Sequence, residues 1–161
     1  MRLDMQCADT IGVLPEHDEQ VSWLPVDYAA KTIVELVNLP MSSPASPASP
    51  VYHILHPTLV SWSSILDTLE AARLRFKRLP RQEWLKVLRA SDPDERRNPS
   101  RKLLGFFEDK YGGKDVRAGL PLSVEKTVKL SRWLREVPDV DEGLAAKWVG
   151  AWRESGFLRK E

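Results

Sequence analysis

The sequence has little of several features that mark common protein classes. Its single cysteine, Cys7, excludes an internal disulfide and any zinc site built on several cysteines. Charge of one sign is not in excess, because 24 Lys and Arg residues stand against 23 Asp and Glu residues. The chain therefore lacks the positive field that attracts nucleic acid or an anionic membrane. No apolar run reaches the roughly 18 residues that span a bilayer, and residues 1–14 hold no signal peptide. We expect a cytoplasmic protein with neither a nucleic-acid nor a membrane partner.

Glycine-rich turns and clustered metal ligands are lacking as well. Gly112, Gly113 and Gly119 are not spaced to cradle a pyrophosphate at the start of a helix, which excludes the usual dinucleotide and P-loop motifs. His53 and His56 would point to opposite faces at the end of a strand and would not share one metal ion easily. We expect this chain to bind no cofactor and no metal by itself.

Hydrophobic residues, by contrast, are plentiful. They make up 42% of the 161 residues, enough to fill one core, so we expect a single domain over residues 1–161. Residues 1–20 are expected to form a loosely ordered leading segment. Residues 40–50, reading PMSSPASPASP, predict a flexible loop, since Pro, Ser and Ala cannot bury a core there.

Most of the remaining pattern is helical. Apolar side chains at helical spacing predict about six helices, the first ending near Asn38. The apolar run Val51–Leu55, stopped by Pro57, predicts a buried strand, and Phe76–Leu79 predicts a second one. The predicted fold class is mainly α with one or two short strands, an α+β domain. The side chains expected to cap helices are those of Asp27, Ser61, Asn98, Ser123 and Asp141.

Three side chains are candidates for catalysis, and each has a structural alternative. His53 is either a hydrogen-bonded core histidine or a ligand-binding residue. His56 precedes Pro57 at a strand end, from which side chains in α/β folds often reach a ligand. Asp27 could donate or accept a proton, although its expected helix-capping position also explains it.

Aromatic residues provide the candidates for substrate binding. Most of the six tryptophans lie at helical spacing beside Leu or Val, which indicates core packing, whereas Trp23 lies beside Pro25 in an extended stretch and could line a pocket for an apolar acyl chain. The full set of substrate-binding candidates is Trp23, Tyr28, His56, Trp62, Phe106 and Phe107.

Several segments, in order, resemble the end of the thioester-reductase domains of fungal NRPS-like adenylate-forming reductases, a branch of the extended short-chain dehydrogenases. The matching segments are Val21–Asp27 (VSWLPVD), Val51–Ile54 with His56–Pro57, Val60–Trp62, Glu83–Leu85, Asn98–Pro99 with Lys102–Leu104, and Trp148 with Trp152 ahead of Ser155–Leu158. The resemblance covers nearly the whole chain. One departure is His56, where the family pattern has asparagine before the proline.

This resemblance implies a division of labour. In such reductases an amino-terminal Rossmann half holds NADPH and a catalytic Tyr-x-x-x-Lys pair, while the carboxyl-terminal part covers an acyl substrate delivered by a carrier domain. This chain is similar only to the second part. None of its three tyrosines has lysine four positions later, since Thr32, His56 and Asp115 stand there. NADPH would therefore act only through a Rossmann half that this sequence does not include.

Three functions stay open at this point. The first is acyl-substrate binding within a larger NADPH-dependent thioester or carboxylic acid reductase of secondary metabolism. The second is a free-standing relative that catalyses a cofactor-independent step, such as a Diels-Alder type cyclisation of a polyketide or terpenoid intermediate, in an aromatic-lined cavity. The third is a non-catalytic interaction module. The expected partners are an apolar acyl, polyketide or terpenoid molecule, a Rossmann or carrier domain, and a second copy that covers an exposed apolar face.

Overall fold

The computed structural model describes residues 2–39, 51–113 and 122–158, so the loop expected at residues 40–50 lies outside the described residues. The chain is mainly helical with a few short strands, as the sequence predicts. Its residues group into two compact units: unit 1 comprises residues 1–19, 61–118 and 141–161, and unit 2 comprises residues 20–60 and 119–140. The expected single domain over residues 1–161 stays a prediction. No helix in the described ranges combines the length and apolar character needed to cross a membrane.

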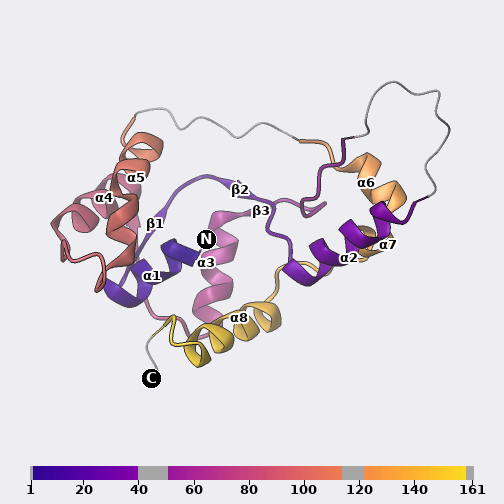
Figure 1. Cartoon of the computed structure of the whole chain (residues 1–161). Coiled ribbons are helices and arrows are strands. Elements are labelled where there is room, and N and C mark those ends of the chain that lie inside the picture. Colours follow the sequence, from indigo (N-terminus) through magenta and orange to yellow (C-terminus); the bar gives the residue numbers. More distant parts are fainter. Residues whose placement is uncertain (1, 40–50, 114–121, 159–161) are drawn as a thin grey trace. The chain divides into compact units, whose positions relative to one another are not determined.

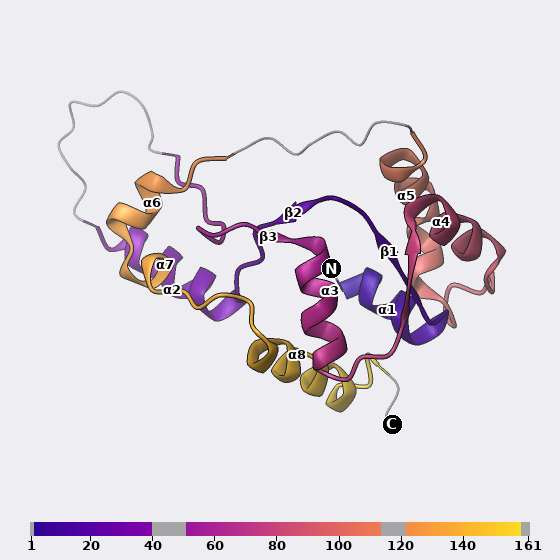
Figure 2. The same cartoon turned by 180° about the vertical axis from the view of Figure 1, so that it is seen from behind.

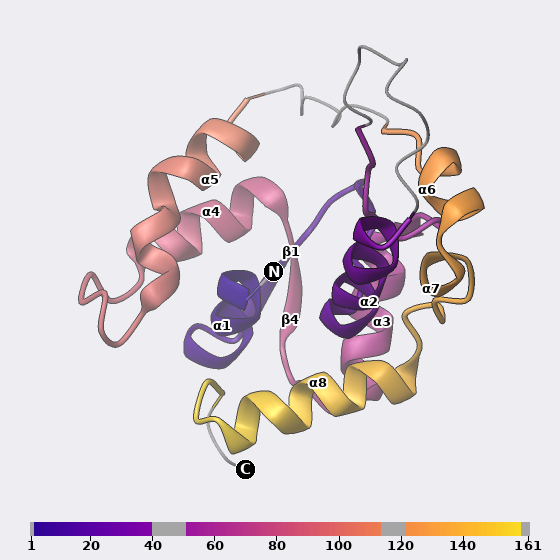
Figure 3. The same ribbon diagram turned by 45° about the vertical axis from the view of Figure 1, so that its right-hand side comes forward.

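Unit 1 begins with elements that the sequence analysis missed. Helix α1 (Arg2–Thr10) is followed by Gly12, whose φ of 70° turns the chain into strand β1 (Val13–Glu16). Strand β4 (Lys77–Pro80) pairs with β1 in parallel, with Val13 opposite Lys77 (Figure 3). Met5, Cys7 and Leu14 are fully buried. The expectation of a loosely ordered segment over residues 1–20 was therefore wrong, because these few apolar residues pack into the core although they show no long periodic pattern.

Helices complete unit 1. Helix α3 (Trp62–Ala71) crosses α8 (Glu142–Glu154), and α4 (Arg81–Ala90) lies beside the 3-10 helix η1 (Pro99–Leu103) and α5 (Leu104–Tyr111), as Figures 1 and 2 show. The side chains predicted to face the core are buried in both α3 and α4. The buried residues of these two helices are Trp62, Ile65, Leu66, Leu69, Trp84, Leu85 and Leu88.

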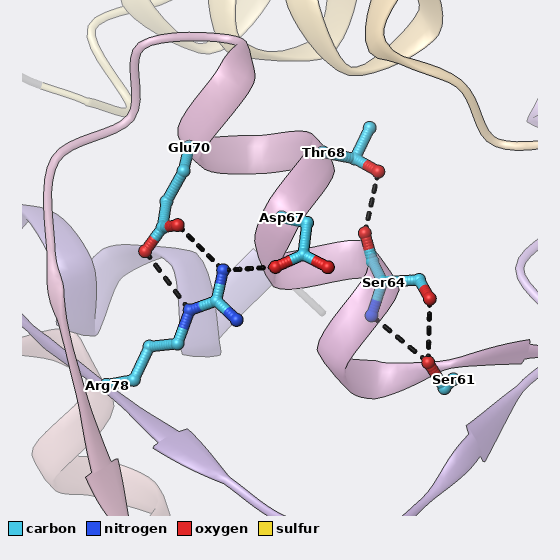
Figure 4. Close-up of polar contacts among 6 residues, drawn as sticks. All are labelled: Ser61, Ser64, Asp67, Thr68, Glu70 and Arg78. Atoms are coloured by element: carbon cyan, nitrogen blue, oxygen red, sulfur yellow. Dashed lines mark hydrogen bonds and ion pairs between the residues drawn. The ribbon is translucent and has the colours of Figure 1, made fainter.

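Two of the five predicted caps are confirmed. The Ser61 hydroxyl accepts from the Ser64 N–H at 3.1 Å (Figure 4), and the Asp141 carboxylate accepts from the Leu144 N–H at 2.8 Å. The Asn98 side chain makes no capping bond and instead donates to the Ser91 hydroxyl at 2.7 Å, which explains why it is buried.

Unit 2 consists of α2 (Val26–Val37), α6 (Glu125–Leu130), α7 (Arg132–Arg135) and irregular chain. Its α2 starts after Pro25, so Asp27 lies in the first turn and does not cap the helix, contrary to expectation. The single helix expected between Ser123 and Leu134 is broken at Ser131, which caps α7 through the Leu134 N–H at 3.2 Å. Strands β2 (Gln20–Val21) and β3 (Val60–Ser61) form a second, minimal pair.

The predicted buried strand Val51–Leu55 is also wrong. These residues are irregular, and the Val51 side chain is exposed. A buried parallel strand needs neighbouring strands on both sides. In the described part of unit 2 the only strand partners are the two-residue β2 and β3, which leave this run without a sheet to join.

Candidate functional site

His17 lies at the centre of a charged aromatic cluster in unit 1 that sequence reasoning did not select. Its ring stacks on Trp62, with centroids 5.2 Å apart and planes 16° apart, and lies 5.1 Å from the Tyr111 ring. Its Nε2 lies 2.9 Å from a Glu19 carboxylate oxygen, and Lys110 Nζ lies 3.1 Å from the same carboxylate. The residues come from the segment after β1, the start of α3 and the end of α5, which no periodic pattern could have linked.

The electrostatics of this cluster favour a fixed arrangement. Burial lowers the pKa of Lys110, but hydrogen bonds with Tyr111 and Glu19 outweigh burial, so its pKa is raised. Lys110 therefore stays charged beside Glu19. The His17 side chain is only 7% exposed, which leaves little ring surface for a substrate. The cluster holds the segment after β1 against α3 and α5.

His56, one of the catalytic candidates, is buried and bonded to the backbone on both sides. Its Nδ1 lies 3.1 Å from the Thr58 backbone nitrogen and 3.0 Å from the Thr58 carbonyl oxygen, and its Nε2 lies 3.1 Å from the Pro138 carbonyl oxygen. These contacts tie the 51–60 segment to the chain after α7. The geometry favours the structural alternative for His56 over proton transfer.

His53 also has a backbone partner, but it is less enclosed. Its Nδ1 donates to the Ser123 carbonyl oxygen at 3.0 Å, and its own carbonyl oxygen accepts from the Thr127 hydroxyl at 2.8 Å. These bonds fix the 51–60 segment on the start of α6. His53 is half-buried, so one edge of its ring remains open to solvent.

Asp27 and Tyr28 lie on the first turn of α2 beside an aromatic surface. Tyr28 meets Trp133 edge to face, with centroids 6.0 Å apart, and Lys31 Nζ lies 4.3 Å from the Trp133 ring and 5.1 Å from the Tyr28 ring. Asp27 is exposed and lies 3.7 Å from Lys31. We call Tyr28, Lys31 and Trp133 the Tyr28 surface. Here two partly exposed rings and a cation of unit 2 come together.

A buried polar contact holds α2 in position beside this surface. The Ser131 hydroxyl donates to the Glu35 carboxylate at 2.6 Å, and Ser131 and Thr32 are both fully buried. This hydrogen bond is the largest cause of a lowered pKa at Glu35, opposed by desolvation and supported by the N–H groups of Arg132 and Trp133. No sequence pattern indicates this pair, because Glu35 lies within an apolar pattern.

The other substrate-binding candidates occupy different settings. Trp62 is buried and donates through Nε1 to the Pro15 carbonyl oxygen at 2.7 Å, and Phe107 is buried against Trp84. Phe106 is exposed on α5, and Trp23 is half-buried. Trp23, Tyr28 and His56 belong to unit 2, whereas Trp62, Phe106 and Phe107 belong to unit 1. Neither unit alone contains the predicted set.

Gly112 does not fit a pyrophosphate-binding position, and metal-ligating side chains do not cluster in the described ranges. Gly112 ends α5, and a Cβ there would lie 2.3 Å from the Glu108 carbonyl oxygen, so this glycine serves a helix carboxyl end. A pyrophosphate binds at the opposite end of a helix. In the ranges that the structure covers, no three His, Cys, Asp or Glu side chains gather to hold a metal.

Comparison with known proteins finds similarity to fungal polyketide synthases. No family model matches it. It is 34% identical over 157 residues to the citrinin polyketide synthase of Monascus ruber and 33% identical over 157 residues to the non-reducing polyketide synthase sor2 of Hypocrea jecorina. It is also 33% identical over 156 residues to the 3-methylorcinaldehyde synthase tropA of Talaromyces stipitatus. These alignments cover 94–96% of this chain and 6% of each relative.

The chain is homologous to the carboxyl-terminal region of fungal non-reducing polyketide synthases. A solved structure, the terminal R domain of the myxalamid PKS-NRPS biosynthetic pathway, shares its fold with a TM-score of 0.69 at 24% identity. That match covers 98% of this chain and 38% of the R domain chain. The fold therefore agrees with the expected likeness to part of a terminal reductase domain, and the relatives agree with the expected link to secondary metabolism. The narrower link to NRPS-like adenylate-forming reductases stays a prediction, because these relatives are polyketide synthases.

Proposed function

We propose that this chain is the acyl-substrate-binding part of a thioester reductase that releases an aromatic polyketide as an aldehyde. The observation that carries the proposal is the match of almost the entire chain to a terminal R domain fold and to the ends of polyketide synthases. One of those relatives is named a 3-methylorcinaldehyde synthase, and an aromatic aldehyde is the two-electron reduction product of an aromatic thioester. The hydride donor, NADPH in this proposal, is held by a part beyond this chain, since the described residues do not fit it.

Within unit 2, the Tyr28 surface suits the acyl group. Two partly exposed rings offer an apolar face to a flat aromatic acyl group, and Lys31 beside them can donate a hydrogen bond to a phenol or thioester oxygen. His56 is not part of the Tyr28 surface, and its ring is bonded to backbone groups of Thr58 and Pro138. Phe106, exposed on α5 of unit 1, stays a substrate-binding candidate from the sequence.

The test is direct binding of a defined thioester. The S-(2,4-dihydroxybenzoyl) thioester of pantetheine, titrated into the full chain and followed by calorimetry, is expected to bind saturably. Tyr28→Ala is expected to weaken binding by about five- to tenfold, as expected for loss of one aromatic contact. Tyr52→Ala is the matched control, because Lys126 Nζ lies 4.7 Å from the Tyr52 ring without a second aromatic partner in the described contacts. Absence of saturable binding, or an equal loss in both variants, would reject the Tyr28 surface as the acyl site.

The alternative of a cofactor-independent cyclisation has no observation in its favour. His53, His56 or Asp27 could supply it with a hydrogen bond or a proton, but both histidines are bonded to backbone groups and Asp27 is exposed beside Lys31. It stays a prediction from the sequence alone.

A further inference from the structure

Lys31, the cation of the Tyr28 surface, has its charge compensated within α2. Its Nζ lies 3.7 Å from an Asp27 carboxylate oxygen one helical turn earlier. An acidic residue four positions before a lysine is the favourable order of such a pair, and the first turn of α2 is where the helix dipole favours a carboxylate. Asp27 therefore belongs to this surface as the counter-charge of Lys31.

The hydrogen-bond donors of Lys31 remain available although its charge is compensated. A separation of 3.7 Å is too long for a hydrogen bond, so Asp27 attracts the ammonium group without accepting any of its three N–H groups. The Lys31 side chain is 44% exposed, which leaves these donors accessible. A ligand that lies against the rings of the Tyr28 surface thus meets a hydrogen-bond donor whose positive charge is already balanced.

The charged residues that flank Trp133 on α7 are paired in the same way. Arg132 lies 2.9 Å from a Glu136 carboxylate oxygen, and Arg135 is attracted to Glu35 on α2, which lies beside α7 (Figure 3). Both arginines therefore have an anionic partner. These residues give the Tyr28 surface no excess of positive charge that would attract an anion.

We propose that Asp27 makes the Tyr28 surface selective for an uncharged aromatic thioester over the free acid formed when water hydrolyses that thioester, an inference that rests on the function proposed above. The two ligands share a ring and its hydroxyl groups, but the acid is a carboxylate at neutral pH. The thioester gains the ring contacts and a hydrogen bond from Lys31. The carboxylate also meets the negative charge of Asp27, which offsets its attraction to Lys31.

The exposure of Asp27 sets the size of this selectivity. Its side chain is 58% exposed, so water screens its charge strongly. Removing one unit charge about 5 Å from a ligand carboxylate in water should change the affinity about three- to fivefold. Salt at about 1 M shortens the screening length to about 3 Å and should remove most of this change. The affinity of an uncharged ligand depends on neither effect.

The experiment measures the affinity of both ligands for the full chain by calorimetry. The probes are the S-(2,4-dihydroxybenzoyl) thioester of pantetheine and 2,4-dihydroxybenzoate, the latter titrated in competition with the thioester. A pH of about 6 keeps the benzoate ionised and the phenols protonated. Asp27→Asn removes the charge and keeps the size of the side chain. Asp67→Asn is the matched control, because Asp67 is an exposed aspartate on α3 that also pairs with a cation, Arg78.

Asp27→Asn is expected to tighten binding of the acid about three- to fivefold in about 20 mM salt and to change thioester affinity less than about twofold. The gain should disappear in about 1 M salt, and Asp67→Asn should alter neither affinity. A merely structural role of Asp27 would change both affinities together. An unchanged acid affinity, an equal change for both ligands, or a gain that persists in high salt would overturn the proposal.

The same titrations separate this inference from the function on which it rests. Absence of saturable thioester binding to the native protein would reject the proposed function, and the inference with it. Saturable thioester binding with the same ratio of acid to thioester affinity in the native protein and in Asp27→Asn would overturn the inference alone.

Discussion

Two buried tryptophans of unit 1 should respond in opposite ways to the same substitution. Trp62 is 4% exposed and donates through Nε1 to the Pro15 carbonyl oxygen at 2.7 Å. Trp84 is 0% exposed, and its Nε1 has no hydrogen-bond partner among the described residues. Changing either residue to phenylalanine removes the same indole N–H and the same part of the ring. The difference in stability between the two variants therefore reports the hydrogen bond that only Trp62 makes.

The magnitudes follow from the cost of cavities and of unpaired polar groups. Truncating an indole to a benzene ring in a core costs about 1–2 kcal/mol, a fraction of the 3–5 kcal/mol for removing a whole aromatic side chain. Trp62→Phe also leaves the Pro15 carbonyl without this donor, which adds about 1–3 kcal/mol. Trp84→Phe instead removes a buried N–H whose desolvation costs the native protein about 1–3 kcal/mol. Removing this cost offsets the loss of packing against Phe107. Trp62→Phe should therefore destabilise unit 1 by about 2–6 kcal/mol more than Trp84→Phe.

Urea unfolding followed by far-ultraviolet circular dichroism measures the difference. Both variants should keep the same slope with denaturant if the folded and unfolded states are otherwise unchanged. A Trp84→Phe variant as unstable as Trp62→Phe would refute the reasoning, since it would mean that the Trp84 N–H does make a stabilising bond, for example to a buried water.

Three further outcomes concern polar contacts. Ser131→Ala should lower stability by about 1–3 kcal/mol in thermal unfolding, because it removes both the α7 cap and the bond to Glu35; Ser61→Ala, which removes a cap alone, should cost less. The pKa of Glu35 is lowered from its ordinary value of 4.5, so its stabilisation is present above that value and is lost as pH falls through the lowered pKa. The difference in free energy of unfolding between the native protein and Glu35→Gln should thus decrease as pH is lowered. An increase in this difference would contradict a lowered pKa of Glu35. The Arg78 guanidinium lies 2.7 Å from a carboxylate oxygen of Asp67 and of Glu70 (Figure 4), and these contacts raise its pKa. Both carboxylates are exposed, so Arg78→Met should lower the free energy of unfolding by under about 1 kcal/mol. In about 1 M salt the substitution should have no measurable effect on stability.

The sequence predicted those parts of the fold whose stability is local or strongly periodic. The helices that begin after Ser61 and Asp141 have a capping side chain followed by apolar residues that face a core, and both features were confirmed. The strand near Phe76–Leu79 was also found, as β4. In these elements propensity, capping and burial all favour the same structure.

Prediction failed where burial depends on distant partners. Residues 1–20 were expected to be loosely ordered because their apolar residues are few, yet Leu14 on β1 is buried beside β4, some sixty residues later in the chain. The His17 cluster likewise joins residues from three separate segments. Contacts of this kind depend on tertiary pairing, and a single sequence carries no periodic signal for them.

The wrongly predicted strand at Val51–Leu55 and the exposed valines of α2 share one physical feature. The valines of α2 and the run beginning at Val51 both have the composition of buried structure, and both are exposed. Such residues would be poor choices for a surface that always faces water, since each exposed valine forgoes the free energy of its burial. Apolar composition at helical or strand-like spacing therefore predicts that a segment is ordered more reliably than it predicts which of its side chains are buried, because burial is decided by the elements that pack against it.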